Sequence, residues 1–205
     1  MPLQNRVDPW GNLNAISAKG AWLGNRGILH NNQKQLVAQW RHSNWVTCVL
    51  EYKGRRREIF SPNNYSELFF LDEATALSAG HRPCAECRSK RYREFKEFWC
   101  KANHLESVTS RELDKQLHAE RAIRGGGKAV FEAEFVNLPS GTFIELEGKA
   151  LLHWSGNLYS WSATGYTLFE GSLEPSKVVT VLTPFSIVGI FRLGFTPQVH
   201  ESVCS

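Results

Sequence analysis

The sequence has no long hydrophobic run. No window of this 205-residue chain approaches the roughly eighteen apolar residues in succession that a membrane-spanning helix needs. Residues 1–8 also lack the apolar stretch of a secretory signal peptide. We therefore expect a soluble, cytoplasmic protein without a membrane partner.

Cysteine is scarce and odd in number. Five cysteines without regular spacing do not form the framework of a disulfide-stabilised secreted domain. Disulfides persist in oxidising compartments, whereas free thiols persist in reducing ones. The cysteine content therefore predicts a reducing compartment.

Several motifs of familiar enzyme classes are missing. The chain has no internal repeat and no Gly-x-Ser-x-Gly sequence. Its glycine run at residues 125–127 lacks the preceding strand and the following Lys-Ser/Thr pair of a phosphate-binding loop. The net charge is +4 with a pI near 8.8, a mild balance that does not by itself indicate a polyanionic partner.

What is present predicts an α+β fold in three parts. Residues 1–104 are expected to hold a turn-rich start and an antiparallel meander, with strands over 35–41, 45–52 and 55–60, followed by a cysteine knuckle and a helix to about residue 102. Residues 105–129 connect the two ends of the chain through a helix over 110–123, announced by a capping box from Thr109 to Glu112, and a glycine-rich turn.

The third part, residues 130–205, has short strands punctuated by turns. We expect strands over 142–146, 150–154, 158–161 and 177–182. Thr183 and Pro184 are typical of a helix N-terminus, so a short helix ending at Gly194 should complete this β-rich unit.

The most specific stretch lies at residues 71–88. Asp72 can cap a short helix, and Gly80 stands where a left-handed residue would end it. Pro83 holds Arg82 extended, so the chain cannot run helically into the Cys-Ala-Glu-Cys sequence at residues 84–87. A Cys-x-x-Cys in a turn can point both sulfurs at one metal ion, and the N-terminus of a following helix favours thiolates.

The run at residues 76–87, Ala-Leu-Ser-Ala-Gly-His-Arg-Pro-Cys-Ala-Glu-Cys, resembles the zinc-binding domain of the Ada DNA-repair proteins. In that family an Ala-(apolar)-Ala-Ala-Gly-(aromatic)-Arg-Pro-Cys-x-x-Cys run supplies the second pair of zinc ligands. This chain has Ser78 for an alanine and His81 for the aromatic residue. The resemblance covers residues 72–88 and implies a zinc site at Cys84 and Cys87.

The family's first ligand pair has no full counterpart here. That pair is a Cys-x-x-x-Cys whose leading member accepts the methyl group, whereas Cys48 is the sole cysteine upstream of Cys84. Methyl transfer is therefore not expected. Tetrahedral zinc needs four ligands, and the best set is Cys48, Cys84, Cys87 and one of His81, Cys100 or His104, of which we take His81. The alternative is a site that has lost its metal and keeps buried thiols.

Arginines around the knuckle favour a nucleic-acid-binding protein, possible roles being DNA repair and the response to damaged or foreign DNA. Guanidinium groups can neutralise backbone phosphates without reading the base sequence. The expected contacts to DNA or another nucleic acid are Arg55, Arg56, Arg57, Arg82, Arg88 and Arg91.

A second hypothesis is a hydrolase or glycosylase acting on nucleic acid. On the expected helix, Asp114, His118 and Arg121 share one face, with Glu120 alongside. A carboxylate and an imidazole four residues apart can hold a metal or share a proton, and an arginine can stabilise developing negative charge. The same spacing also fits a surface ion pair, and a non-catalytic structural protein is the third hypothesis.

Overall fold

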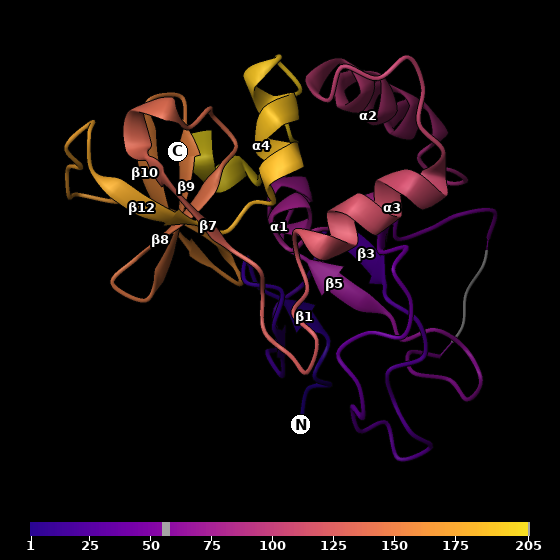
Figure 1. The fold of residues 1–205 in the computed structure, drawn as a ribbon. Coiled ribbons are helices and arrows are strands. Elements are labelled where there is room, and N and C mark those ends of the chain that lie inside the picture. The colour runs from indigo at the N-terminus through magenta and orange to yellow at the C-terminus, as the bar shows by residue number, and fades with distance from the viewer. Residues whose placement is uncertain (55–57, 205) are drawn as a thin grey trace.

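The structure, a computed structural model, describes residues 1–54 and 58–204. Its fold is α+β, with two six-stranded sheets. In Figure 1 the sheet of the C-terminal half lies on one side of α4 (Phe185–Arg192), and the N-terminal half with α2 (Ser89–Ala102) and α3 (Ser110–Ala119) lies on the other. The arginines at positions 55–57 lie outside the described residues.

The first sheet is built from very short strands in the order β2-β1-β5-β3-β4-β6. Its strands β1 and β5, and likewise β4 and β6, are parallel, whereas the other neighbours are antiparallel. Strand β4 thus lies between β3 and β6. The members are β1 (Arg6–Val7), β2 (Leu13–Asn14), β3 (Trp22–Asn25), β4 (Val46–Cys48), β5 (Leu68–Phe70) and β6 (Arg82–Pro83).

The described residues do not form the meander expected over residues 35–60. Residues 35–41 contribute a single bridge, between Leu36 and His30. Of the strand expected over 55–60, residues 55–57 lie outside the described residues, and residues 58–60 form no strand, with 59 and 60 in a turn. Strand β4 pairs instead with β3, which comes from the start of the chain, where we expected little regular structure. Strands of two to four residues are too short to show the alternation by which a strand is recognised, so the turn residues around them dominate the pattern.

Helix α1 (Glu73–Ser78) begins and ends as the sequence predicts. The Asp72 carboxylate accepts from the N–H of Thr75 at 2.8 Å. Gly80 has a φ of +82° just after the helix, and a side chain there would collide with Arg121. The last carbonyls of the helix are also satisfied, because the N–H of Gly80 donates to the carbonyl of Leu77 and Lys128 donates to that of Ser78.

Each of the two long helices of the N-terminal half has one end where the sequence predicts it. Helix α2 ends at Ala102, and its stripe of Tyr92, Phe95 and Trp99 is buried. Helix α3 begins with a complete capping box between Thr109 and Glu112. It ends at Ala119, earlier than the predicted residue 123, because the residues that follow turn away to contact neighbouring elements.

The second sheet is antiparallel throughout, in the order β11-β10-β9-β8-β12-β7. The four expected strands are confirmed, and two more, β7 and β11, extend the sheet at its edges. Two 3-10 helices, η1 (Phe135–Asn137) and η2 (Glu201–Cys204), complete this half. The strands are β7 (Phe131–Glu134), β8 (Phe143–Leu146), β9 (Lys149–Trp154), β10 (Asn157–Ser162), β11 (Gly165–Leu168) and β12 (Val178–Val181).

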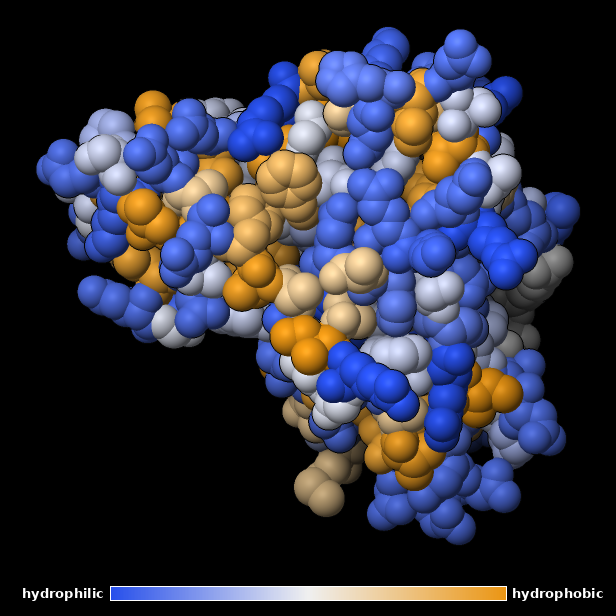
Figure 2. Space-filling model, in the orientation of Figure 1, coloured by the Kyte–Doolittle hydropathy of each residue, from blue (hydrophilic) through white to orange (hydrophobic). Residues whose placement is uncertain are grey.

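One hydrophobic cluster joins the two halves. Phe95 and Trp99 of α2 pack with Leu113 of α3 and with Ile187 and Ile190 of α4. Polar residues cover most of the face seen in Figure 2, and the apolar residues there form smaller groups. In the part of the chain that the structure describes, no helix has the length and apolar character needed to cross a membrane.

Candidate metal centre

Two of the three clustered cysteines come from neighbouring parallel strands. Cys48 ends β4, and Cys84 directly follows β6. The strand register places Thr47 opposite Pro83, and the N–H of Cys84 donates to the carbonyl of Thr47 at 2.9 Å. The pairing of two distant segments therefore brings the two thiols together.

The third cysteine lies in the turn that leads into α2. The backbone N–H groups of Glu86 and Cys87 donate to the sulfur of Cys84, and the N–H of Val49 donates to the sulfur of Cys87. The sulfur atoms of Cys48, Cys84 and Cys87 all lie within 4.8 Å of one another. Three sulfurs from two strands and one turn thus meet at one point.

This arrangement fits a metal ion held by thiolates. Zinc bound to sulfur at about 2.3 Å in tetrahedral geometry separates its sulfur ligands by about 3.8 Å. The three sulfurs therefore need only small rotations of their side chains to share one ion. Among the side chains that the structure describes, no other group of three histidine, cysteine or acidic residues comes as close.

The three thiols do not hold their protons equally. A hydrogen bond from the Cys48 thiol, with further bonds from backbone N–H groups, lowers the pKa of Cys84 to about 5 against the effect of burial. The same bond to Cys84, together with burial, raises the pKa of Cys48 far above its usual range. Burial also raises the pKa of Cys87. The network therefore favours the thiolate on Cys84 over thiolates on Cys48 and Cys87, whose protons a metal ion would displace.

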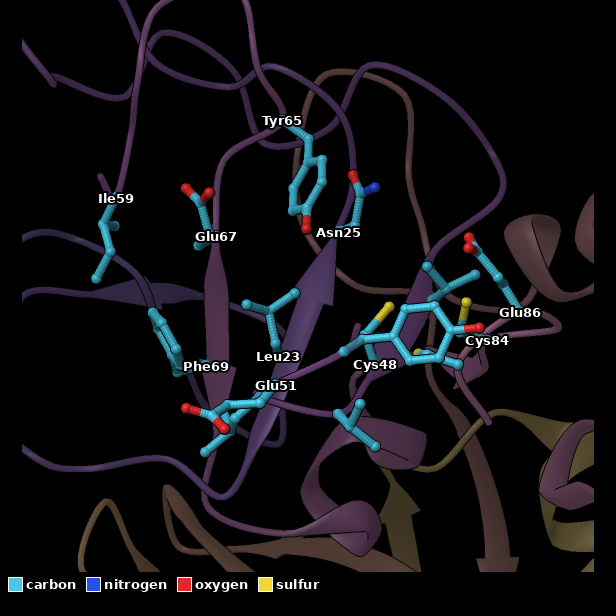
Figure 3. A pocket seen from close by; sticks show the side chains of 15 residues that line it. Leu23, Asn25, Cys48, Glu51, Ile59, Tyr65, Glu67, Phe69, Cys84 and Glu86 are labelled. Carbon is cyan, nitrogen blue, oxygen red and sulfur yellow. The ribbon is translucent and has the colours of Figure 1, made fainter. Parts of the chain in front are cut away.

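A cavity of about 880 Å³ begins at the sulfur cluster. Its floor is one face of the first sheet, where Leu23 of β3 lies opposite Cys48 on one side and opposite Phe69 of β5 on the other. Figure 3 shows the same order, with Leu23 between Phe69 and Cys48. The apolar side chains of Leu50 and Ile59 also line the cavity. The sulfurs thus stand at one end of a space whose floor is apolar and whose lining also includes Glu51, Glu67 and Glu86.

His81 is not the fourth ligand. Its ring is buried against Phe70 at 4.7 Å between ring centroids, and its Nε2 accepts from Arg26 at 3.2 Å. Burial and the charge of Arg26 hold the pKa of His81 well below its usual range. In an extended segment, residues an odd number apart point to opposite faces, so His81 faces away from Cys84. The structure therefore does not bring His81, the fourth ligand that we expected from the sequence, to the three sulfurs.

The other two candidates for the fourth ligand are also outside the sulfur group. Cys100 on α2 and His104 just after it both line a separate cavity on the outer side of that helix. Neither belongs to the group formed by the three clustered sulfurs. The described residues thus supply three ligands from the predicted set of four.

The arginines expected to contact phosphates are engaged inside the protein where the structure describes them. Arg82 makes a two-point ion pair with Asp114, at 2.8 and 2.7 Å. Arg88 and Arg91 both bind the buried carboxylate of Glu73, at 2.5 and 2.7 Å. Arg55, Arg56 and Arg57 were part of the same prediction and lie outside the described residues.

The residues proposed for acid–base catalysis do not converge. Asp114 is held by Arg82, and His118 lies edge-on to Trp40 at 4.6 Å between ring centroids. Glu120 accepts from the N–H and hydroxyl of a serine on α4, and Arg121 donates to two backbone carbonyls. Four neighbouring residues of sequence thus reach four different partners, as expected of side chains that connect elements.

Sequence reasoning missed the floor of the cavity. Leu23 stands in a turn-rich region, and Phe69 stands in the apolar run over residues 68–71. A short apolar run does not reveal which of its residues faces the core. The alternation of burial along β5, with Leu68 and Phe70 buried and Phe69 half-buried, shows the two faces only once the strand is paired.

The chain matches no family model, no curated protein and no solved structure.

Proposed function

We propose that the protein binds zinc through Cys48, Cys84 and Cys87 and presents the fourth coordination position to the adjoining cavity. One observation supports this proposal above all. Three sulfur atoms within 4.8 Å of one another stand at one end of a cavity of about 880 Å³. Thiolates are soft ligands that favour zinc over magnesium or calcium.

The number of ligands bears on the role of the ion. Structural zinc sites are closed by four protein ligands, whereas catalytic and ligand-binding sites use three and leave one position for solvent or substrate. The cluster of Cys48, Cys84 and Cys87 has the second pattern among the described residues. We therefore favour a centre that binds or transforms a small molecule over a knuckle that only stabilises the fold.

The proposal predicts one zinc per chain and an affinity that falls as the pH falls. Cys48 and Cys87 have raised pKa values, so zinc must displace their protons, and acid favours the protonated, metal-free state. Calorimetric titration in two buffers of different ionisation enthalpy should show about two protons released per zinc near pH 7.

The control is Cys100→Ser. This cysteine lies outside the sulfur cluster, so the variant should keep one zinc with the same affinity. Absence of zinc from the wild-type protein after loading, or loss of zinc in Cys100→Ser, would show that the centre is wrongly assigned.

Nucleic-acid binding stays a prediction from the sequence, as does hydrolysis by Asp114, His118, Glu120 and Arg121. Because Arg82 and Arg88 are buried in ion pairs, we expect the arginines at 55–57 to carry any contact with phosphates. Changing these three to alanine should then make log K for duplex DNA fall less steeply with log salt. The size of the slope should decrease by up to about 2.7, or about 0.9 per contact. An unchanged slope, measured by fluorescence anisotropy, would remove these arginines from the interface.

A further inference from the structure

We propose that the fourth coordination position takes the sulfur of a small apolar thiol whose carbon skeleton lies on the floor formed by Leu23 and Phe69. This inference rests on the proposed zinc centre and adds the chemical class of its ligand. It draws on the position of the sulfurs relative to the sheet and on the composition of the floor.

The geometry sets the direction and length of the site. Cys48, Leu23 and Phe69 occupy one row across three neighbouring strands. Adjacent strands lie about 4.8 Å apart, so the row spans about 10 Å from the ligand cysteine to the far phenyl ring. A ligand bound at the sulfur cluster therefore has an apolar strip beside it that is as long as an aryl-alkyl group.

The chemistry of the cluster selects the head group. Three thiolates make a soft, electron-rich site, and soft donors such as sulfur suit it better than carboxylate or alcohol oxygen. On binding, the ligand's S–H bond breaks, the proton passes to solvent, and one sulfur–metal bond replaces one bound water. No electron is transferred, so the step needs no oxidant or reductant.

The residues that line the cavity favour a ligand with an apolar carbon skeleton. On the floor and beside it, Leu23, Phe69 and Ile59 are apolar, and Leu50 is 48% exposed although it lines the same cavity, which Glu51, Glu67 and Glu86 also line. The volume of about 880 Å³ falls within the range of about 300–1,000 Å³ that is usual for small-molecule sites. Burial of an aryl or alkyl group here removes apolar surface of both partners from water.

The test uses protein loaded with cobalt(II), whose sulfur-to-metal charge-transfer absorption reports each thiolate bound. We expect 2-phenylethanethiol to raise this absorption saturably. 2-Mercaptoethanol, which keeps the thiol and lacks the apolar body, should bind at least about ten-fold more weakly, a factor that corresponds to 1.4 kcal/mol. 2-Phenylethanol, which lacks the thiol, should leave the spectrum unchanged.

Substitutions of cavity residues test the contribution of the apolar floor independently of the contribution of the metal ligands. The substitutions Phe69→Ala and Leu50→Ser, the latter at an exposed position, should each lower the affinity for 2-phenylethanethiol. Neither should change the affinity for cobalt or for 2-mercaptoethanol. Leu50→Ser guards against a folding defect in Phe69→Ala, and Val136→Ala, at an exposed position outside the cavity lining, should change nothing.

Two kinds of failure can be told apart. A protein that takes up no cobalt overturns the metal centre itself, and the present inference with it. A protein that holds cobalt and shows no response to 2-phenylethanethiol overturns only the assignment of the ligand, because another group then fills the fourth position. Equal affinity for the two thiols, or unchanged affinity in both cavity variants, overturns the role of the apolar floor.

Discussion

The Cys84→Ser variant is expected to lose its zinc and to melt far below the wild-type protein. Cys84 is the sulfur that accepts from Cys48 and from two backbone N–H groups, so its removal takes away the thiolate that holds the cluster together. The unfolded chain does not hold the three sulfurs together, so the free energy of metal binding becomes part of the folding free energy. Thermal unfolding followed by circular dichroism, with zinc analysis of the same samples, measures both effects.

Three comparisons make this result specific. A strong chelator added to the wild-type protein should reproduce the melting temperature of Cys84→Ser, and Cys48→Ser should show a drop of similar size. Cys100→Ser, at the edge of the core shared by α2 and α4, should stay near the ordinary average of about 1 kcal/mol for a point mutation. If the chelator leaves the wild-type melting temperature unchanged, the cysteines are plain buried thiols.

Asp114→Asn is expected to lower the free energy of unfolding by about 3–5 kcal/mol, the range found when one partner of a buried ion pair is removed. The side chains of Arg82 and Asp114 are 6% and 5% exposed. Asparagine cannot neutralise the guanidinium, so the charge of Arg82 stays buried without its partner. Denaturant titration gives the free energy directly.

The matched control is Glu94→Gln. Glu94 also pairs with an arginine, but its side chain is 47% exposed, and exposed pairs contribute about 0–1 kcal/mol. The variant should therefore be nearly as stable as the wild-type protein. Equal effects of Asp114→Asn and Glu94→Gln would show that the Arg82–Asp114 pair is not buried as described. A stable Asp114→Asn protein would also reopen the catalytic hypothesis for this residue.

The sequence predicted the local structure correctly wherever that structure depends on contacts between residues close together in the chain. Asp72 caps α1 through a residue three positions on, and the capping box of α3 likewise closes within one turn. The hairpin turn at residues 155–156 shows the left-handed backbone that its glycine implies. These features depend on hydrogen bonds within about four residues, so the pattern of side chains along the chain predicts them.

Local sequence patterns could not show which arginines are exposed and which pair with a buried carboxylate. Arg82, Arg88 and Arg91 look alike in sequence whether they face solvent or a carboxylate. Their buried partners, Asp114 in α3 and Glu73 in α1, lie in other elements of the fold. A guanidinium is removed from a nucleic-acid surface only when the fold buries it beside such a partner, and that depends on the packing of α1, α2 and α3.

One part of the metal centre follows from the sequence, and the other part follows only from the tertiary structure. The sequence by itself determined that Cys84 and Cys87 lie in one turn, because Pro83 and the start of α2 shape that turn locally. That Cys48 joins them, and that His81 does not, was decided by the parallel pairing of β4 with β6. The cavity floor likewise exists only because β3 lies between β4 and β5. Strands this short carry no signal of their own register, so tertiary packing alone selects their partners.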